Sequence, residues 1–267
     1  MLPGKNAVEE ALRAERKLLR IVVARESDIA RGPIVKEARR RHIEVVFADK
    51  GALDSLVGKG NHQGIVGIAE PKPPASVDDI FELARRRREP PFIAILDGVE
   101  DPQNLGAVIR SAEVAGIHGI IIPERRAAGV SPSVHKASAG AAEYMKVVRV
   151  VSMTNVMAHI RKQNVWLIGA DMHAERSVWD EDLKGPVAFV IGGEDRGISP
   201  AIAERCDRMV KIPMKGHIRS LNVAATAAIL FFEKRRQDAR AEKKDGAKAP
   251  SRNGGKAQSG TKNERRR

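Results

Sequence analysis

The chain has 267 residues, with 47 Lys and Arg against 34 Asp and Glu, and its formal net charge is +13. A chain this basic points to a polyanionic partner, either a nucleic acid or an anionic membrane surface. No apolar run approaches the roughly 20 residues of a membrane span, and the first ten residues lack a secretory signal pattern, so we expect no membrane partner and a cytoplasmic protein. The single cysteine, Cys206, fits a reducing compartment.

Residues 1–70 alternate helical and strand-like stretches, the pattern of a small α/β unit. The expected elements are, in chain order, a helix over 6–13, a strand over 20–24, a helix over 35–41, a strand over 43–47, a helix over 53–57 and a strand over 64–69. A stiff extended stretch, Pro71–Pro74, and a predicted connecting helix over 77–88 follow. We therefore expect a first domain at 1–70 and a linker at 71–90.

A second α/β domain is expected at 91–236. Residues 92–96 form a continuous apolar run, which is typical of a strand buried on both faces of a parallel sheet. The next helix is predicted to begin near Pro102 and to end at Gly116. Further strands are predicted over 119–122, 147–151, 165–170, 187–191 and 209–212, with helices between them.

A closing helix is predicted after Ser220, whose hydroxyl would cap its first turn. Its apolar residues at helical spacing form one face: Leu221, Ala225, Ala228, Ile229 and Phe232. From 235 to the end, twelve Lys and Arg stand against four Asp and Glu, so +8 of the net charge lies there. Residues 237–267 contain no large apolar side chain, which predicts a disordered basic tail. Whether the tail binds nucleic acid or only aids solubility is open at this point.

Three unusual segments directly follow predicted strands, where ligands of open α/β sheets bind. The first, 96–111, places Asn104 at the opening of a helix and Arg110 on the helix side away from the apolar face. An arginine there is suited to bind a phosphate through its two-pronged guanidinium. The pattern alone equally allows Asn104 to be a cap and Arg110 a solvated surface charge.

The second segment, 190–199, has two glycines after an apolar strand, which let a ligand approach the backbone closely. Glu194 in the same turn is suited to acid–base chemistry or to binding a ribose. The spacing is not that of a dinucleotide-binding GxGxxG loop, and a plain Gly-rich turn is the alternative. The third segment, 212–223, combines a loop with the start of the closing helix. No Cys/His/Asp cluster has metal-ligand spacing, so we predict no metal.

Together, residues 101–110, 191–198 and 212–224 resemble in order and spacing the three motifs of the SpoU/TrmH family, within the SPOUT superfamily of RNA 2′-O-methyltransferases. Residues 4–12, 61–64 and 136–142 resemble the branch that methylates a guanosine of 23S rRNA. The resemblance covers about residues 2–236. It implies a small L30e-like α/β RNA-binding domain, followed by an α/β domain whose parallel sheet is tied in a trefoil knot.

The resemblance also implies S-adenosyl-L-methionine as cofactor, 23S rRNA as partner, and a homodimer with its active site near the subunit interface. The donor would lie in the knot loops, against these residues: Gly192, Gly193, Gly197, Ile212, Met214, Gly216 and Leu221.

The family's proposed catalytic residue falls on Arg110, with Asn104, Ser220 and Asn222 orienting it and the ribose. A guanidinium stays protonated, which makes it a poor general base. Two interpretations avoid this difficulty. Either Arg110 binds the target's phosphate, which accepts the proton, or Arg110 acidifies the hydroxyl while Glu194 takes the proton. We favour the first.

Aromatic residues make up only 3% of the chain, so base stacking is expected to contribute little to RNA recognition. The expected RNA contacts lie in the first domain and the arginine run: Asn6, His62, Gln63, Arg85 and Arg86. Two alternatives stay open. One is a tRNA guanosine 2′-O-methyltransferase, against which the N-terminal domain argues. The other is a non-catalytic RNA-binding or ribosome-assembly protein, against which the intact motif residues argue.

Overall fold

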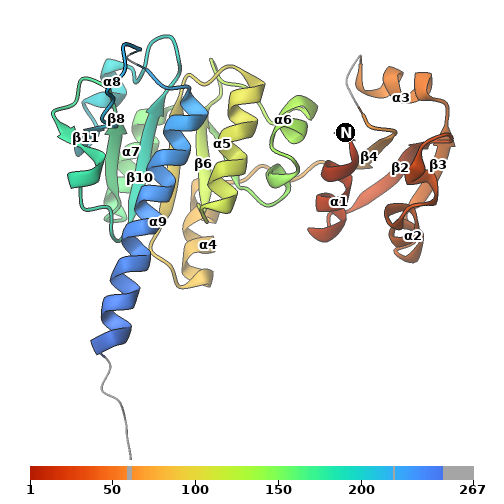
Figure 1. The fold of residues 1–267 in the computed structure, drawn as a ribbon, viewed down its shortest axis with the longest axis horizontal. Coiled ribbons are helices and arrows are strands. Elements are labelled where there is room, and N and C mark those ends of the chain that lie inside the picture. Colours follow the sequence, from red (N-terminus) through yellow and green to blue (C-terminus); the bar gives the residue numbers. More distant parts are fainter. Residues whose placement is uncertain (59–61, 219, 249–267) are drawn as a thin grey trace, which may run out of the picture.

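The computed structural model describes residues 1–58, 62–218 and 220–248 and has two domains, each built around one sheet (Figure 1). The smaller sheet has the order β1-β4-β2-β3; β2 and β3 are parallel, and β4 is antiparallel to both of its neighbours. Its elements are β1 (Leu2–Pro3), α1 (Lys5–Arg13), β2 (Leu18–Ala24), the 3-10 helix η1 (Asp28–Arg31), α2 (Pro33–Arg40), β3 (Glu44–Ala48), α3 (Lys50–Val57) and β4 (Ile65–Ala69).

The larger sheet is parallel throughout and has the order β7-β6-β5-β10-β8-β11-β9, as the continuous apolar strands predict. Its elements are α4 (Val77–Arg87), β5 (Phe92–Asp97), α5 (Pro102–Val114), β6 (Gly119–Pro123), α6 (Pro132–Ala137), η2 (Ala141–Glu143), β7 (Val147–Val150), α7 (Met153–Lys162), β8 (Trp166–Ala170), β9 (Arg176–Ser177), η3 (Val178–Asp180), β10 (Val187–Gly192), α8 (Pro200–Ala203), β11 (Arg208–Lys211) and α9 (Val223–Lys248).

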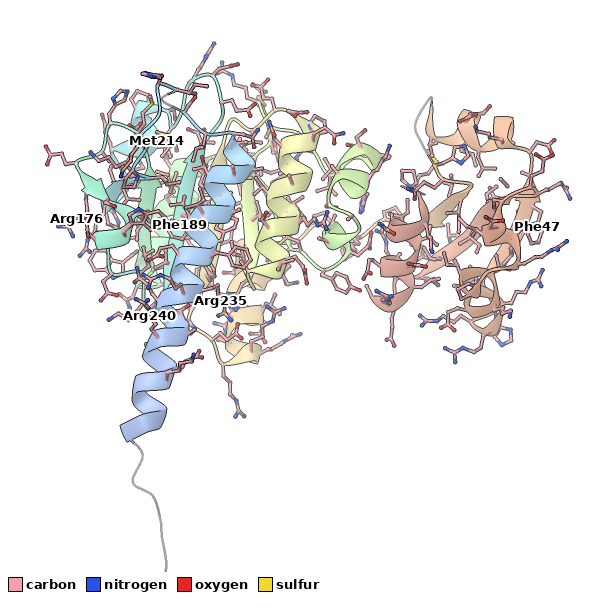
Figure 2. All side chains as sticks on the ribbon, viewed as in Figure 1. Phe47, Arg176, Phe189, Met214, Arg235 and Arg240 are labelled. Carbon is pink, nitrogen blue, oxygen red and sulfur yellow. The ribbon has the colours of Figure 1, made fainter. Side chains whose placement is uncertain are left out.

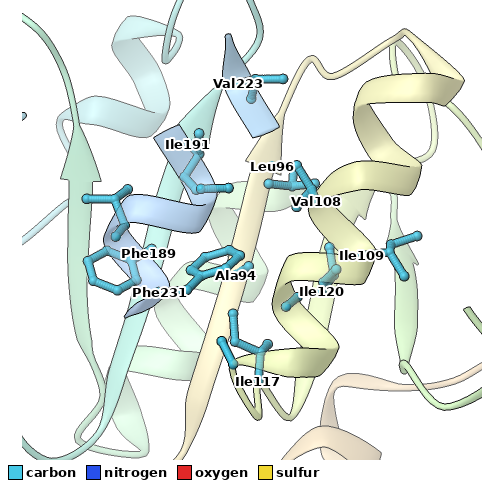
Figure 3. Close-up of a cluster of buried hydrophobic side chains, with 14 of the residues drawn as sticks. Ala94, Leu96, Val108, Ile109, Ile117, Ile120, Phe189, Ile191, Val223 and Phe231 are labelled. Carbon is cyan, nitrogen blue, oxygen red and sulfur yellow. The ribbon is translucent and has the colours of Figure 1, made fainter. Parts of the chain in front are cut away.

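Successive residues of β5 alternate between two cores, one on each face of the larger sheet. Ala94 and Leu96 join the core under α5 and α9, where Phe189 of β10 and Phe231 of α9 pack with ring centroids 6.3 Å apart (Figure 3). Ile93 and Ile95 join the core under α4, α7 and α8. Because both faces are covered, every position of β5 before its last residue is apolar.

The helix α4 belongs to the larger domain. Ile80 and Phe81 of α4 are buried in the core that contains Ile93. The helix is started by a capping box between Ser76 and Asp79. The predicted linker at 71–90 is therefore wrong over its second half, because an amphipathic helix beside an apolar strand buries its own face on that strand.

The N-terminal cap of α9 is Asn222 and not the predicted Ser220. The side-chain oxygen Oδ1 of Asn222 accepts hydrogen bonds from the backbone N–H groups of Ala224 at 2.9 Å and Ala225 at 3.4 Å. Ser220 lies too far before the first turn to reach these donors.

The face that α9 buries is also not the predicted one. The residues that α9 contributes to the core are Val223, Ala227, Leu230 and Phe231. The predicted stripe is largely exposed, with Phe232 at 48% and Leu221, just before the helix, at 40%. This helix is apolar on two faces, and helical periodicity alone does not say which face meets the sheet.

Helix α9 extends to Lys248, so the prediction of disorder is wrong for residues 237–248. Gln237 bonds to the backbone of Glu181 and Leu183 at 2.9 Å each, and Asp238 pairs with the buried Lys234 at 3.0 Å. Ala, Arg, Lys and Glu have high helix propensity, so a helix continues there without an apolar core. Figure 2 shows Arg240 on this stretch, whose end projects beyond the sheet. The remainder of the predicted tail, 249–267, lies outside the described residues.

A buried charge cluster joins the two domains. Glu143 of η2, whose side chain is fully buried, meets Arg16 of the small domain at 2.6 Å, Lys72 at 3.1 Å and His135 of α6 at 3.2 Å. Burial works to raise the pKa of Glu143, but the hydrogen bond from Arg16 and the positive charge of Lys72 outweigh burial and hold this pKa below its ordinary value. The cluster therefore holds η2 and α6 of the large domain against the small domain.

Along the described part of the chain, no helix has the length and apolar character that crossing a membrane requires.

Candidate active site

The side-chain amide of Asn222 connects two of the predicted site residues. Its Nδ2 donates to Oδ1 of Asn104 at 2.9 Å and to Oε1 of Glu194 at 2.7 Å. Because its Oδ1 also accepts two backbone N–H groups of α9, both donors and both acceptor lone pairs of this amide are committed. The sequence-based grouping of Asn104, Glu194 and Asn222 therefore corresponds to one hydrogen-bonded network.

Each member of the network follows from a local feature of the sequence. Asp101 caps α5 through the N–H groups of Gln103 and Asn104, and this cap sets Asn104 in the first turn. Glu194 follows β10, the parallel neighbour of β5. Carboxyl ends of parallel strands meet at one edge of the sheet, and α9 begins at the same edge. Three segments far apart in the sequence therefore meet there.

The turn that carries Glu194 is held by Asp97, the last residue of β5. The carboxylate of Asp97 accepts hydrogen bonds from the backbone N–H and the hydroxyl of Ser199, at 2.8 and 2.7 Å, and its carbonyl accepts one from Gly193 at 2.8 Å. A Cβ at Gly192 would meet the backbone of Gly197 at 1.9 Å, and one at Gly193 would meet the carbonyl of Gly98 at 2.1 Å. These glycines are thus required because the neighbouring backbone leaves no room for a side chain. The sequence suggested only that a ligand approaches them closely.

Two cavities lie on either side of this turn. The larger, about 970 Å³, extends from Asp101 and Asn104 to the loop after β6. The smaller, about 440 Å³, lies between the turn, the loop after β8 and the segment before α9. Residues 193–197, Glu194 among them, line both cavities. Glu194 is therefore accessible to a ligand in either cavity.

Most of the predicted donor-binding residues gather at the smaller cavity. Its lining includes Gly192, Gly193, Gly197, Ile212, Met214 and Leu221, as well as the predicted Ser220. Figure 2 shows Met214 at the end of the large domain where α9 begins. Gly216 does not line either cavity.

Other residues of the smaller cavity were not predicted. They include Asp171, Met172 and His173, which follow β8, and Thr226 of α9. Since β8 is the parallel neighbour of β10, the rule that ligands bind beyond strand ends would have pointed to this loop. The sequence did not show that these two strands are adjacent.

Arg110 lies away from both cavities. It is exposed in the second half of α5, it has no hydrogen bond or ion pair among the described residues, and it lines neither the larger nor the smaller space. Arg110 stands six positions after Asn104 in the helix, so the two side chains point to different sides. The expectation that Asn104 orients Arg110 is therefore not met within one chain.

The predicted RNA-binding residues are scattered. His62 is buried: its Nδ1 accepts from the backbone N–H of Gly64 at 3.0 Å, and its Nε2 lies 3.2 Å from Asp54, so it shapes the loop before β4. Asn6 is exposed, and Gln63 accepts from the backbone N–H of Lys5 at 3.2 Å. Asn61, the first residue of the 61–64 motif, lies outside the described residues.

Arg85 and Arg86 each pair with Glu82 on α4, at 3.0 and 2.9 Å. Because α4 ends just before β5 begins, these arginines lie at the amino end of the strands, opposite the two cavities. Within one chain they therefore share no cavity with Glu194.

Comparisons with known proteins cover both domains. Residues 91–232 match the model of the SpoU rRNA Methylase family, and residues 1–75 match the model for RNA 2′-O ribose methyltransferase substrate binding. The 23S rRNA (guanosine-2′-O-)-methyltransferase RlmB of Xanthomonas campestris is 40% identical over 207 residues, which are 76% of this chain and 82% of that protein. The protein of the same name from Coxiella burnetii is 34% identical, over 88% of this chain and 94% of its own length.

A solved structure has the same architecture. The SpoU methyltransferase AviRb of Streptomyces viridochromogenes, in complex with the cofactor AdoMet, superposes with a TM-score of 0.76 at 28% identity, over 88% of this chain and 89% of that one.

Proposed function

This chain belongs to the SpoU rRNA methylase family, and on that premise we propose that it transfers a methyl group from S-adenosylmethionine to the ribose 2′-hydroxyl of a guanosine in 23S rRNA. The observation that carries the proposal is the network of Asn104, Asn222 and Glu194 between two cavities at the strand ends. The names of the RlmB relatives support rRNA over tRNA.

The smaller cavity fits the methyl donor. Its volume of about 440 Å³ lies within the usual range of small-molecule sites. Ile212 and Leu221 offer apolar surface for an adenine ring, and the carboxylate of Asp171 suits a cationic ligand. When bound, S-adenosylmethionine supplies an electrophilic methyl group. The larger cavity then receives the nucleotide, and the turn at 193–197 separates the two ligands.

Glu194 is the proton acceptor in this proposal. A ribose hydroxyl is a weak nucleophile, so methyl transfer needs a group that takes its proton. Asn222 fixes Oε1 of Glu194 at 2.7 Å, and Oε2 has no partner among the described residues. A carboxylate held on one oxygen and open on the other, in the wall between the cavities, supports the interpretation in which Glu194 rather than a phosphate accepts the proton.

A second copy of the chain supplies Arg110 in this proposal. Arg110 lies on an exposed face of α5 that also carries Val114, which is 65% exposed, and Phe232 of the neighbouring helix α9 is 48% exposed. An apolar surface of this kind favours an interface. In a homodimer formed there, Arg110 of one chain acts at the cleft of its partner. The trefoil knot, the absence of a metal and the cytoplasmic location stay predictions.

The direct test incubates the purified protein and methyl-labelled S-adenosylmethionine with deproteinised 23S rRNA, followed by mapping of methylated riboses by mass spectrometry. A single 2′-O-methylguanosine is expected, and its loss in Glu194→Gln by at least about 100-fold would identify the acceptor. Methylation of tRNA in place of rRNA would support the tRNA alternative. Donor and RNA binding with no transfer to either RNA would leave only a non-catalytic role.

A further inference from the structure

The loop after β6, residues 124–130, is a fixed wall of the larger cavity. Glu124 donates its backbone N–H to the carbonyl of Val150 at 2.9 Å and accepts from the guanidinium of Arg149 at 2.8 Å. At the other end, Ala128 donates its N–H to the carbonyl of Val99 at 3.0 Å. Residues at both ends of this loop are therefore hydrogen-bonded to neighbouring segments, and the two arginines between them line the cavity.

Those arginines, Arg125 and Arg126, are exposed cations without a partner among the described residues. Arg126 also has a backbone φ of +57°, a conformation that disfavours residues with a Cβ. A strained backbone conformation persists where the surrounding structure imposes it, and such conformations are frequent at ligand-binding sites. Here it sets two successive guanidinium groups at the edge of the cavity that also contains Asn104 and Glu194.

The charges of this cavity restrict where a phosphate can lie. Of its carboxylates, Asp97 is engaged by Ser199, Asp101 caps α5, and Glu194 is held by Asn222. Its other carboxylates, Glu100, Glu124 and Asp195, repel a phosphate. The cations of the lining are Arg125, Arg126 and Arg196. An RNA strand entering this space can place a phosphodiester favourably only against arginine.

We propose that Arg125 and Arg126 form a binding subsite for an RNA phosphodiester next to the target nucleotide, and that this contact places the ribose at Glu194. The inference rests on the proposed function and assigns to this loop the phosphate contact that the sequence suggested for Arg110. Guanidinium groups bind phosphate oxygens in pairs of parallel hydrogen bonds, which fix orientation as well as position. Arg196 lines both cavities, next to the donor, and is left unchanged in the test.

The test compares Arg125→Ala, Arg126→Ala and the double variant with the wild type, using a synthetic 23S rRNA hairpin that contains the mapped guanosine. Each single variant is expected to raise the KM for RNA about tenfold. The double variant is expected to reduce the slope of log Kd for RNA against log salt concentration by the equivalent of about one to two phosphate contacts. Alanine keeps the Cβ at φ +57°, so the change adds no new backbone strain. Arg126→Lys keeps the charge and is expected to restore only part of the affinity.

Lys162→Ala serves as the matched control, because Lys162 is an exposed cation at the end of α7, on the opposite edge of the sheet. Calorimetric binding of S-adenosylmethionine should be unchanged in all variants, which would show that the donor cavity is intact. An unaltered KM and salt slope in the double variant, with the wild type active, would overturn the phosphate subsite alone. A wild type without any methyl transfer would instead overturn the proposed function.

Discussion

The carboxylate of Glu143 accepts a hydrogen bond from the guanidinium of Arg16 at 2.6 Å, across the boundary between the two domains. Lys72, from the segment between the domains, approaches the other carboxylate oxygen at 3.1 Å. The Glu143 side chain is fully buried, so its charge depends on these cations. This buried carboxylate thereby helps to hold the N-terminal domain against the domain that contains the cavities, together with the hydrogen bond from Tyr144 to Glu10 at 2.7 Å.

This cluster predicts acid sensitivity. Burial lowers the pKa of His135 to about 4 in the folded chain, from an ordinary value of 6.5. The unfolded state therefore binds more protons between these values, and stability is lost as the pH falls from about 6.5 to about 4. Glu143, whose pKa is also lowered in the folded chain, adds a further loss of unfolding free energy at still lower pH. We expect urea unfolding to show a decrease of about 3 kcal/mol in unfolding free energy across this window from His135.

The variant His135→Gln should remove most of that decrease, and His118, which is also buried and whose pKa burial also lowers, contributes to the slope that stays. An identical pH profile in His135→Gln and wild type would contradict the assignment. Glu143→Gln leaves Arg16 and Lys72 without a counter-ion and should destabilise the chain by about 3 kcal/mol at neutral pH.

Asn222 has two separable roles. In Asn222→Ala, loss of the cap should lower unfolding free energy by about 1 kcal/mol, and loss of the link to Glu194 should lower kcat about 100-fold. Asn222→Asp keeps the capping oxygen but sets a second carboxylate beside Glu194. We expect near wild-type stability with low activity for this variant, measured by thermal unfolding and by labelled methyl transfer. Full activity in Asn222→Asp would show that the amide donors do not matter.

Arg110→Ala should reduce methyl transfer by at least about 100-fold while S-adenosylmethionine binding is kept. Because Arg110 lies outside the cavities of its own chain, a heterodimer of Arg110→Ala with Glu194→Gln should retain one complete site and about half of the wild-type activity. The measurement uses two affinity tags to purify the mixed dimer. An inactive mixed dimer would mean that Arg110 acts within its own chain.

Two C-terminal truncations are expected to differ in their effect on stability. Deleting 249–267 takes away basic residues but leaves α9, so we expect unchanged stability and a flatter dependence of RNA affinity on salt. Deleting 237–267 also removes Gln237 and Asp238, whose partners are the loop at 181–183 and the buried Lys234. That deletion should lower the thermal midpoint. Equal midpoints for the two truncations would show that these contacts contribute nothing.

The sequence by itself determined the elements and the chemistry of the site. Apolar runs such as 92–96 predicted a parallel sheet, and polar segments after three of the strands supplied Asn104, Glu194 and Asn222, because strand burial and loop chemistry are local properties of the chain. The first domain followed from the same alternation of helices and strands.

Only the tertiary structure decided which segments are neighbours. The adjacency of β8 and β10 brought the loop after β8 into the smaller cavity, and the choice of face on α9 left Phe232 exposed. It also separated Arg110 from Asn104 and set Arg125 and Arg126 over the larger cavity. Strand order and helix rotation depend on contacts between residues far apart in the chain, and the periodicity of a single segment carries no information about them.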